Sequence, residues 1–359
     1  MFIAIIIAFI SLIGLLVLHE FGHFILAKRF GVKVEEFGIG YPPRIFGKKI
    51  GETVYSVNLL PFGAFVRVPG EIGETQDERS FSKQPIFKRV LIMLGGVVSF
   101  WIMAILIFSV VFNLGAPVAL GDEETSGFSN PQVQIAAVSP GSPAEAAGLK
   151  PGDTIKTISI LNSQFPISKV REVQSLAEQH KGQEIVFTIE RVKKSFDFNL
   201  VPRVSPPSGE GPLGVALVRM GVKTYPWWQT PWQGISQTWN LTLAVFQGYY
   251  QALANVSQGM PSGVQLTGPV GIFHMMGQAS QMGLGYFLNF IGLISIYLAV
   301  FNILPIPATD GGKLIFLGIE FFRRKPVSPK IEQRITTVFF LAMIGLMVWV
   351  TIKDVIRIF

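Results

Sequence analysis

Four long stretches without a charged side chain dominate this sequence. Residues 1–18, 90–120 and 335–352 contain no Lys, Arg, Asp or Glu, and a fourth uncharged stretch runs from residue 224 to 309. Only 15% of all residues are charged, against about a quarter in a soluble domain. Because a helix of roughly 20 mainly apolar residues crosses a bilayer, we predict an α-helical membrane protein with four transmembrane helices. The predicted spans lie near residues 2–26, 90–114, 286–307 and 336–356.

The charges outside these stretches predict an orientation. Segment 27–89 carries 11 Lys and Arg against 7 Asp and Glu, and segment 309–334 carries 6 against 3, whereas segment 116–230 is balanced at 11 each. Loops rich in Lys and Arg stay in the cytoplasm. We therefore expect a multi-pass protein of the inner (plasma) membrane with both chain ends extracytoplasmic.

Three regions follow from this reading. Residues 1–115 hold the first two membrane helices, residues 128–220 form a small α+β domain outside the membrane, and residues 225–359 hold the last two membrane helices. In the middle region, apolar residues alternate over 155–160 and 185–189, which predicts strands, and 171–180 has a helical pattern.

Tryptophans gather just before the third predicted span. Trp227, Trp228, Trp232 and Trp239 predict an interfacial helix, since indoles favour the headgroup region of a bilayer. Packing of these rings against the outer domain is the alternative.

Segment 52–70 has a different pattern. Apolar residues alternate over 53–59 and again over 64–68, with Leu-Pro-Phe-Gly between them, which is typical of a β-hairpin. The segment is apolar for a cytoplasmic loop, so we expect a membrane-associated hairpin beside the first helix. An ordinary surface hairpin is the alternative.

A His-Glu-x-x-His motif follows the first uncharged stretch. His19 and His23 share one face of a helix because they are four residues apart, and this spacing suits two ligands of a tetrahedral zinc ion. Glu20 can then act on a water at the metal. Ionisable groups inside a membrane are costly, so a chance occurrence here is the weaker reading.

A third ligand is needed, and His180, His274 and several carboxylates are candidates. Asp310 is favoured by depth, because it follows the third span, which runs inward like the first. A turn aspartate before Gly-Gly is the alternative reading of Asp310.

With Asn302–Gly312 and Gly268–Ile272 added to the first motif, the chain resembles the site-2 proteases, of the bacterial regulator-of-sigma-E protease type, over nearly its whole length. The resemblance implies His19, His23 and Asp310 as ligands of Zn²⁺ and Glu20 as the catalytic acid and base.

The resemblance also implies a way of holding substrate. Asn302, Pro305 and Pro307 would contact an extended substrate, and the hairpin with Val66 would bind it as an added strand. The expected reaction is hydrolysis of peptide bonds in or near the transmembrane segment of single-span membrane proteins, such as an anti-sigma factor or a remnant signal peptide.

The chain departs from the family pattern in two places. Thr309 precedes Asp310 where the family has Leu, and Gly95–Ser99 lacks the family's Pro and Asn. The second departure puts in doubt a contact of the second helix with the site.

Residues 139–153 end in Gly-Leu-x-Pro-Gly-Asp and resemble a PDZ domain of the bacterial protease type. The resemblance implies that peptide C-termini bind at Leu213, Gly214 and Val215, while a domain that only filters by size is the alternative.

Two other functions stay open for the whole chain. They are a zinc transporter or sensor, which would need ionisable residues along several spans, and a catalytically silent PDZ membrane scaffold, against which Glu20 argues. The expected partners are the lipid bilayer, single-span substrates and peptide C-termini, and we expect no nucleic acid.

Overall fold

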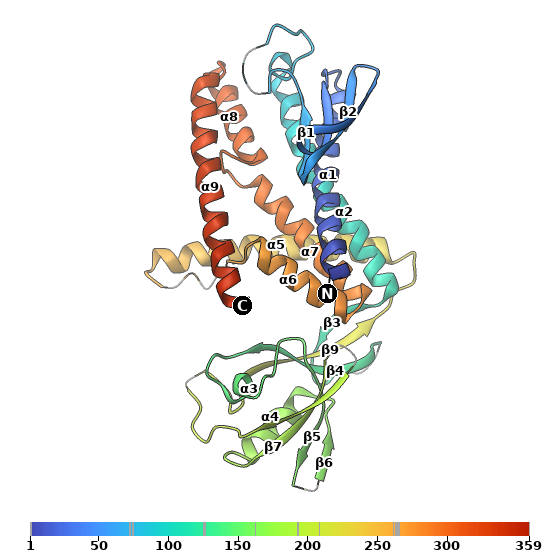
Figure 1. Ribbon diagram of the computed structural model, residues 1–359, viewed down its shortest axis with the longest axis vertical. Helices are drawn as coiled ribbons and strands as arrows, with labels where there is room; N and C mark the ends of the chain where they lie inside the picture. The colour runs from blue at the N-terminus through green and yellow to red at the C-terminus, as the bar shows by residue number, and fades with distance from the viewer. Residues whose placement is uncertain are drawn as a thin grey trace. The chain divides into compact units, whose positions relative to one another are not determined.

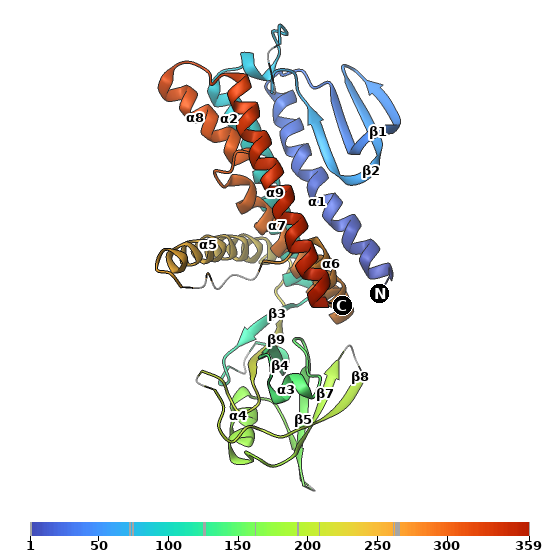
Figure 2. The ribbon, with the colours of Figure 1, turned by 60° about the vertical axis from the view of Figure 1, so that its left-hand side comes forward.

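The computed structural model describes residues 2–358 except 72, 74, 125, 126, 162, 192, 193, 208, 261 and 263–265. The chain divides into two compact units, one of residues 1–110 and 228–359 and the other of residues 111–227. Figures 1 and 2 show both units, and each is described here by itself.

The first unit is mainly helical. Its helices are α1 (Phe2–Arg29), α2 (Ile86–Leu114, whose last residues belong to the second unit), α5 (Thr230–Ser257), α6 (Pro269–Met282), α7 (Leu284–Ile303), α8 (Asp310–Arg323) and α9 (Pro329–Ile358), with a short 3-10 helix at Phe81–Lys83.

Four of these helices are long and apolar enough to cross a membrane. They are α1, α2, α7 and α9, with candidate spans Ile6–Arg29, Ile86–Leu114, Leu284–Ile303 and Pro329–Ile356. The four predicted spans fall on these four helices. Much of their surface is apolar and exposed, as expected for helices that face lipid.

The core of the first unit lies where α1, α2, α6 and α7 meet. Buried residues there include Leu15, Val97, Phe100, Met276 and Ile291. A second cluster joins the end of α1 and the start of α2 to α8 and to the residues that flank β1 and β2. This second cluster brings α1 and α8 close together although the sequence separates them widely.

Strands β1 (Glu36–Ile50) and β2 (Thr53–Arg67) pair with each other and lie beside α1 (Figures 1 and 2). The predicted hairpin was wrong in its pairing. Residues 53–57 and 64–67 do not pair directly, because residues 36–39 lie between them and pair with both. Residues 46–50 pair with 53–57 on the outer side, so the hairpin turn lies at Gly51–Glu52.

This small sheet exposes many apolar side chains. Ile45, Phe46, Phe62 and Ile50 are each more than half exposed, and Phe62 packs its ring edge against Phe9 of α1 with centroids 6.2 Å apart. An apolar sheet that runs along a candidate span favours membrane association over an ordinary surface hairpin.

Helix α5 buries one face and exposes another in an unusual way. Its buried residues are mostly small or polar, among them Gly234, Thr238 and Thr242, whereas exposed apolar residues follow one another every three or four positions. The exposed stripe consists of Trp232, Ile235, Trp239, Leu243, Phe246 and Tyr250. A stripe of this composition suits an apolar environment better than water.

The second unit is an α+β fold with one seven-stranded sheet. Its strands are β3 (Ala116–Leu120), β4 (Ser129–Val138), β5 (Thr154–Ile160), β6 (Ser163–Pro166), β7 (Ile185–Arg191), β8 (Lys194–Leu200) and β9 (Val215–Lys223), and its helices are α3 (Pro143–Ala146) and α4 (Val170–Gln179). The sheet order is β3-β9-β4-β5-β7-β8, and β6 pairs with β5. The strands predicted at 155–160 and 185–189 and the helix predicted at 171–180 are confirmed as β5, β7 and α4.

The Gly-Leu-x-Pro-Gly-Asp motif has a structural role in this unit. Asp153 is 1% exposed, and both of its carboxylate oxygens lie 2.6 Å from guanidinium nitrogens of Arg191. Its carboxylate also accepts from the Lys150 N–H at 2.8 Å. A buried carboxylate satisfied in this way fixes the loop that enters β5.

Candidate metal centre

The first two candidate ligands lie on one face of α1. His19 and His23 are 8% and 7% exposed, and their rings are 4.7 Å apart between centroids. The helix places them together because residues four apart lie one turn above each other. Helix α1 has no proline and continues to Arg29, so the pair lies well inside regular helix.

The third candidate ligand comes from the start of α8. Pro305 and Pro307 lie in the loop after α7 and are incompatible with its continuation, and Asp310 is the first residue of α8. The two glycines that follow make this turn possible. A Cβ on Gly311 would lie 2.1 Å from the Leu304 carbonyl oxygen, and one on Gly312 would lie 2.2 Å from that of Ile306.

Thr309 has a clear reason to be polar. Its hydroxyl lies 3.1 Å from the Leu304 carbonyl oxygen and 3.0 Å from that of Ile306, and it can donate to one of them at a time. The hydroxyl therefore holds the turn that presents Asp310. This position departs from the family pattern without disturbing the candidate ligand.

The three candidate ligand atoms form a nearly equilateral triangle. Asp310 Oδ2 lies 3.4 Å from His19 Nε2 and 3.3 Å from His23 Nε2, and the two nitrogens are 3.3 Å apart. Ligand atoms of a tetrahedral zinc ion are about 3.3 Å apart, given zinc–ligand distances of about 2.05 Å. Asp310 Oδ2 is also buried without a hydrogen-bond partner among the described residues. This donor set fits zinc.

Contacts behind the ligands fix their orientation. His23 Nδ1 lies 2.8 Å from the carbonyl oxygen of Ile92 on α2, so Nδ1 carries the proton and Nε2 keeps its lone pair for a metal. The His19 ring stacks on Phe100 with centroids 4.7 Å apart and an angle of 17° between planes. Helix α2 thus orients both imidazoles.

Gly96 lets α2 approach the ligands this closely. A Cβ at this position would lie 2.2 Å from His23 Nε2 and 2.6 Å from His19 Cε1. Gly22 and Gly95 face each other where α1 and α2 cross, and a Cβ on Gly22 would lie 2.2 Å from the Gly95 carbonyl oxygen. Residues 95–99 lack the family's Pro and Asn, and yet this part of α2 contacts the site directly.

Glu20 lies beside the ligands and contacts the hairpin. Its Oε2 accepts a hydrogen bond of 3.1 Å from the Val66 N–H. Residues 64–67 use alternate main-chain groups to pair with residues 36–39, and the Val66 N–H points instead to Glu20. Strand β2 thereby places a main-chain donor at the candidate centre.

The other predicted site residues belong to several different elements. Asn302 is near the end of α7, where its amide donates to the Leu298 carbonyl oxygen at 2.9 Å, and Pro307 accepts at its carbonyl oxygen from Thr336 at 3.1 Å. Leu213, Gly214 and Val215 belong to the second unit, where Leu213 is buried and Val215 begins β9.

Two rival ligands have other partners. His180 Nδ1 lies 2.9 Å from Gln183 Oε1 in the second unit, and His274 Nε2 lies 3.0 Å from Gln278 Nε2 on α6. The described residues form one cluster with metal-ligand spacing, which consists of His19, His23 and Asp310.

Sequence reasoning missed Ile92, Gly96 and Phe100, which are all on α2. Their contacts with the imidazoles depend on how α1 and α2 cross, and residue types alone do not report this. One signal was available, because adjacent glycines inside a membrane helix often mark a close helix crossing.

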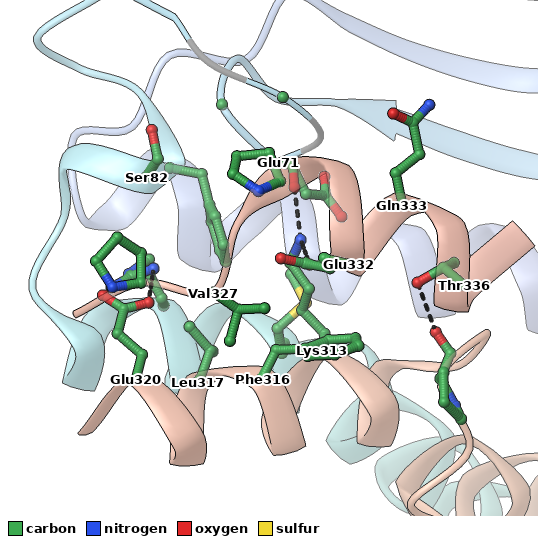
Figure 3. A pocket seen from close by; sticks show the side chains of 18 of the residues that line it. Glu71, Ser82, Lys313, Phe316, Leu317, Glu320, Val327, Glu332, Gln333 and Thr336 are labelled. Carbon is green, nitrogen blue, oxygen red and sulfur yellow. Dashed lines mark hydrogen bonds and ion pairs between the residues drawn. The ribbon is translucent and has the colours of Figure 1, made fainter. Parts of the chain in front are cut away.

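A cavity of about 400 Å³ adjoins Asp310. It is lined by the loop after β2, the start of α2, helix α8 and the start of α9 (Figure 3). Lys313 Nζ donates to the Glu71 carbonyl oxygen and to Glu332 Oε1, both at 2.5 Å, and Arg89 pairs with Glu320. Polar groups around an opening beside Asp310 suit water.

Comparison with known proteins gives the family. Residues 7–346 match the model of peptidase family M50. A protein of Clostridium perfringens is 35% identical over 353 residues, which cover 98% of each chain. Zinc metalloprotease RasP of Oceanobacillus iheyensis is 28% identical over 442 aligned residues, which cover 99% of each chain. RasP of Geobacillus kaustophilus is 27% identical over 441 aligned residues, with 99% of this chain and 98% of the relative covered.

The family model matches nearly the whole chain. The donor atoms of the candidate centre fit zinc, and the relatives are named zinc metalloproteases. The four candidate spans add that the protein is a multi-pass membrane protein. The chain therefore belongs to peptidase family M50, the site-2 protease family, and is a membrane zinc metalloprotease whose cofactor is Zn²⁺.

Proposed function

We propose that this protease cuts peptide bonds in or near the transmembrane segments of single-span membrane proteins, with His19, His23 and Asp310 as zinc ligands and Glu20 as acid and base. One observation carries the proposal, namely the triangle of donor atoms with sides of 3.3–3.4 Å, two of which belong to the candidate span of α1. Regulated intramembrane proteolysis is the physiological setting that this chemistry fits.

Different residues of the chain have different roles in the proposed reaction. His19, His23 and Asp310 would hold the zinc ion, which would supply a Lewis acid for the scissile carbonyl and for the attacking water. Glu20, one residue from His19, takes the proton of that water and returns it to the leaving amine nitrogen. Ile92 and Phe100 keep both imidazoles aimed at one point.

The substrate must unfold locally before it can pair with strand β2. A helical peptide bond is shielded, so the substrate must be extended before water reaches its carbonyl. A substrate that pairs with residues 63–67 competes with Glu20 for the Val66 N–H, because this donor contacts the carboxylate in the resting structure. Asn302, Pro305 and Pro307 line the other approach to Asp310 in this proposal.

The proposed orientation follows from the charges. The basic segments 27–89 and 309–334 lie in the cytoplasm, both chain ends are extracytoplasmic, and the membrane is the inner (plasma) membrane. The apolar sheet β1–β2 then dips into the inner leaflet beside α1, and α5 lies along the outer surface. Water reaches the centre through the cavity beside Asp310.

We also propose that the second unit is a PDZ domain. Helix α4 packs near the edge of β9, and the Leu213–Val215 segment precedes that edge, as a groove for an added peptide strand requires. The expected ligands are peptide C-termini.

Zinc content and cleavage test the ligand set together. The purified protein in lipid nanodiscs, with a model single-span substrate, should hold about one zinc ion per chain and cut the substrate. His23→Ala and Asp310→Ala should lose most of the metal and the activity, while His274→Ala, which lies outside the centre, should keep both. A full zinc complement in Asp310→Ala would refute the third ligand.

A further inference from the structure

Strand β9 of the second unit has one edge that is only partly covered. On one side it pairs with β4 along its length, from Val215 opposite Val138 to Val222 opposite Ser129. On the other side β3 covers only its second half, from Arg219 to Lys223. Within the described part of the chain, no strand pairs with residues 215–218 on that second side.

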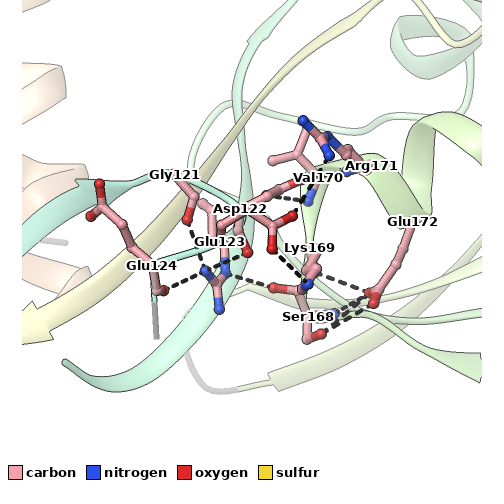
Figure 4. Close-up of polar contacts among 10 residues, drawn as sticks. Gly121, Asp122, Glu123, Glu124, Ser168, Lys169, Val170, Arg171 and Glu172 are labelled. Carbon is pink, nitrogen blue, oxygen red and sulfur yellow. Dashed lines mark hydrogen bonds and ion pairs between the residues drawn. The ribbon is translucent and has the colours of Figure 1, made fainter. Parts of the chain in front are cut away.

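The turn after β3 is fastened to the start of α4 (Figure 4). The Asp122 carboxylate accepts from the N–H groups of Val170 at 2.9 Å and Arg171 at 2.8 Å. These are the first N–H groups of α4, which have no acceptor inside the helix. A residue about fifty positions upstream in the chain therefore caps α4.

Arg219 of β9 holds the same turn from the other side. Its side chain is 3% exposed, and Nη1 lies within 2.7–3.2 Å of the carbonyl oxygens of Gly121, Asp122 and Glu124. Its Nε donates to the Ser168 carbonyl oxygen at 2.9 Å. One buried guanidinium thus ties β9 to residues 121–124 and to the loop before α4.

Residues 116–120 therefore run antiparallel to β9, and the turn at 121–124 is joined to the start of α4. This is the place and direction that a peptide takes when it adds a strand to a sheet beside a helix. The segment turns away at Gly121 and leaves residues 215–218 uncovered. At about 3.3 Å per residue, that stretch has room for about four residues of an incoming chain.

The uncovered end of the edge suits a chain terminus. Gly214 has φ +69°, and a Cβ built there would lie 3.2 Å from Arg203 Nη2, so the guanidinium adjoins this loop. Leu213 is buried, and Val215, Leu217 and Leu176 pack partly exposed against the core. Arg203 Nη1 pairs with Glu210 Oε2 at 3.1 Å, and its Nη2 lies 3.4 Å from the Gly141 carbonyl oxygen, so a ligand carboxylate beside Gly214 would meet the Nη2 side of the guanidinium.

We propose that residues 116–124 occupy the upstream half of the peptide groove, so that the second unit binds only about the last four residues of a chain that ends in a free carboxylate. The inference rests on the proposed PDZ assignment of this unit. Asp122 and Arg219 set the length limit, and Arg203 sets the preference for a free terminus.

A randomised peptide library tests the length limit. The full-length protein in nanodiscs selects from octapeptides with free carboxylates and, separately, from the same octapeptides with amidated ends. For the unaltered protein, enrichment should be confined to about the last four positions and should be lost with the amidated library. Arg203→Ala should lower the preference for the free carboxylate roughly tenfold.

Asp122→Ala should extend the enrichment upstream, because it frees the turn from α4. Glu123→Ala is the matched control, since this neighbouring side chain is exposed and makes only distant ion pairs with Lys169 and Arg171. Amide hydrogen exchange on the same samples should show faster exchange at 116–124 in Asp122→Ala alone, with β5 and β7 protected as evidence of folding. If β5 and β7 lose protection, Asp122→Asn replaces it and should give the same extension.

Three results would overturn the proposal. They are enrichment upstream of the last four positions in the unaltered protein, equal enrichment of amidated peptides, and no enrichment in any sample. Cleavage of the model substrate by the same preparations is measured in parallel. Loss of cleavage with a positive library result would count against the proposed protease function alone, and the reverse would count against the groove alone.

Discussion

At the scale of single residues, the candidate centre depends on a glycine as much as on its ligands. His19, His23 and Asp310 were predicted from motif spacing and membrane depth, and the structure brings their donor atoms together; their role as ligands stays a prediction. Gly96 was not predicted, because its importance comes from the crossing of α1 and α2. Residue types reveal chemistry readily but reveal a close approach of two backbones poorly.

Gly96→Ala should abolish zinc binding, since its Cβ would lie 2.2 Å from His23 Nε2. The backbone of α2 would have to move away, which would misplace both imidazoles. Zinc content of the purified variant by mass spectrometry checks this, and it should fall well below one ion per chain. Gly14→Ala in α1 is the matched control, since nothing lies within 4 Å of a Cβ built there. Normal zinc content in Gly96→Ala would show that the crossing tolerates a methyl group.

At the scale of elements, the helices were easier to predict than the sheet beside them. Long uncharged stretches predicted α1, α2, α7 and α9, because length and apolar composition suffice for a membrane helix. The alternation in 53–59 and 64–68 predicted strands but gave the wrong partner. Residues 37–40 read Phe-Gly-Ile-Gly, and the glycines hide the strand segment 36–39, which pairs on both sides.

Helix α6 is held at its start by the far end of α9. Asp354 is 6% exposed, and its Oδ2 accepts from the Gly271 N–H at 2.8 Å. A Cβ on Gly268 would lie 2.9 Å from the same oxygen, so this glycine makes room for the carboxylate. The Gly268–Ile272 motif that supported the family resemblance therefore has a structural explanation.

Asp354→Ala should destabilise the protein by about 1–3 kcal/mol, because the buried Gly271 N–H loses its acceptor. Thermal unfolding in detergent measures the loss, and Asp354→Asn should recover part of it through its carbonyl oxygen. Lys353→Ala, at the exposed neighbouring position, should cost less. Equal midpoints for Asp354→Ala and the unaltered protein would mean that water replaces the carboxylate at no cost.

The cap on α4 predicts a pH dependence. Burial alone would raise the pKa of Asp122. The hydrogen bonds from the N–H groups of Arg171 and Val170, together with the charge of Arg219, lower it by more than burial raises it, so the pKa lies below its ordinary value. A lowered folded-state pKa contributes stability above the unfolded value of about 3.9, and this contribution is lost as the pH falls through the folded pKa.

Asp122→Asn should therefore weaken hydrogen-exchange protection of α4 at neutral pH, and its difference from the unaltered protein should shrink as the pH falls below about 4. Both proteins are compared at each pH, which removes the intrinsic pH dependence of exchange. A difference that stays constant down to the lowest pH would contradict the ionised cap.

At the scale of the whole molecule, the proposed zinc ion joins segments that are far apart in the sequence. Two ligands come from α1 and the third from α8, with the small sheet, the second unit and helices α2, α5, α6 and α7 between them in the chain. This arrangement could be predicted only through the depth argument, which uses the bilayer as a common reference. The pairing of β3 with β9 was not predicted, because nothing comparable to the bilayer fixes the relative positions of these two strands.

Removal of zinc should loosen this connection. Treatment with a chelator should lower the thermal unfolding midpoint, because a metal that binds only the folded state stabilises it. Added zinc should restore the midpoint in the unaltered protein but should have no effect on Asp310→Ala. An unchanged midpoint after complete removal of zinc would show that α1 and α8 stay together without it.

The most direct test of the proposed mechanism separates metal binding from catalysis at Glu20. Glu20→Gln keeps the size of the side chain and leaves all three proposed ligands in place, but it removes the group that takes the proton from water. The variant in nanodiscs should retain about one zinc ion per chain and should cut the single-span substrate about 10²–10⁴-fold more slowly. Cleavage at the normal rate with zinc bound would contradict the assignment of Glu20 and the mechanism built on it.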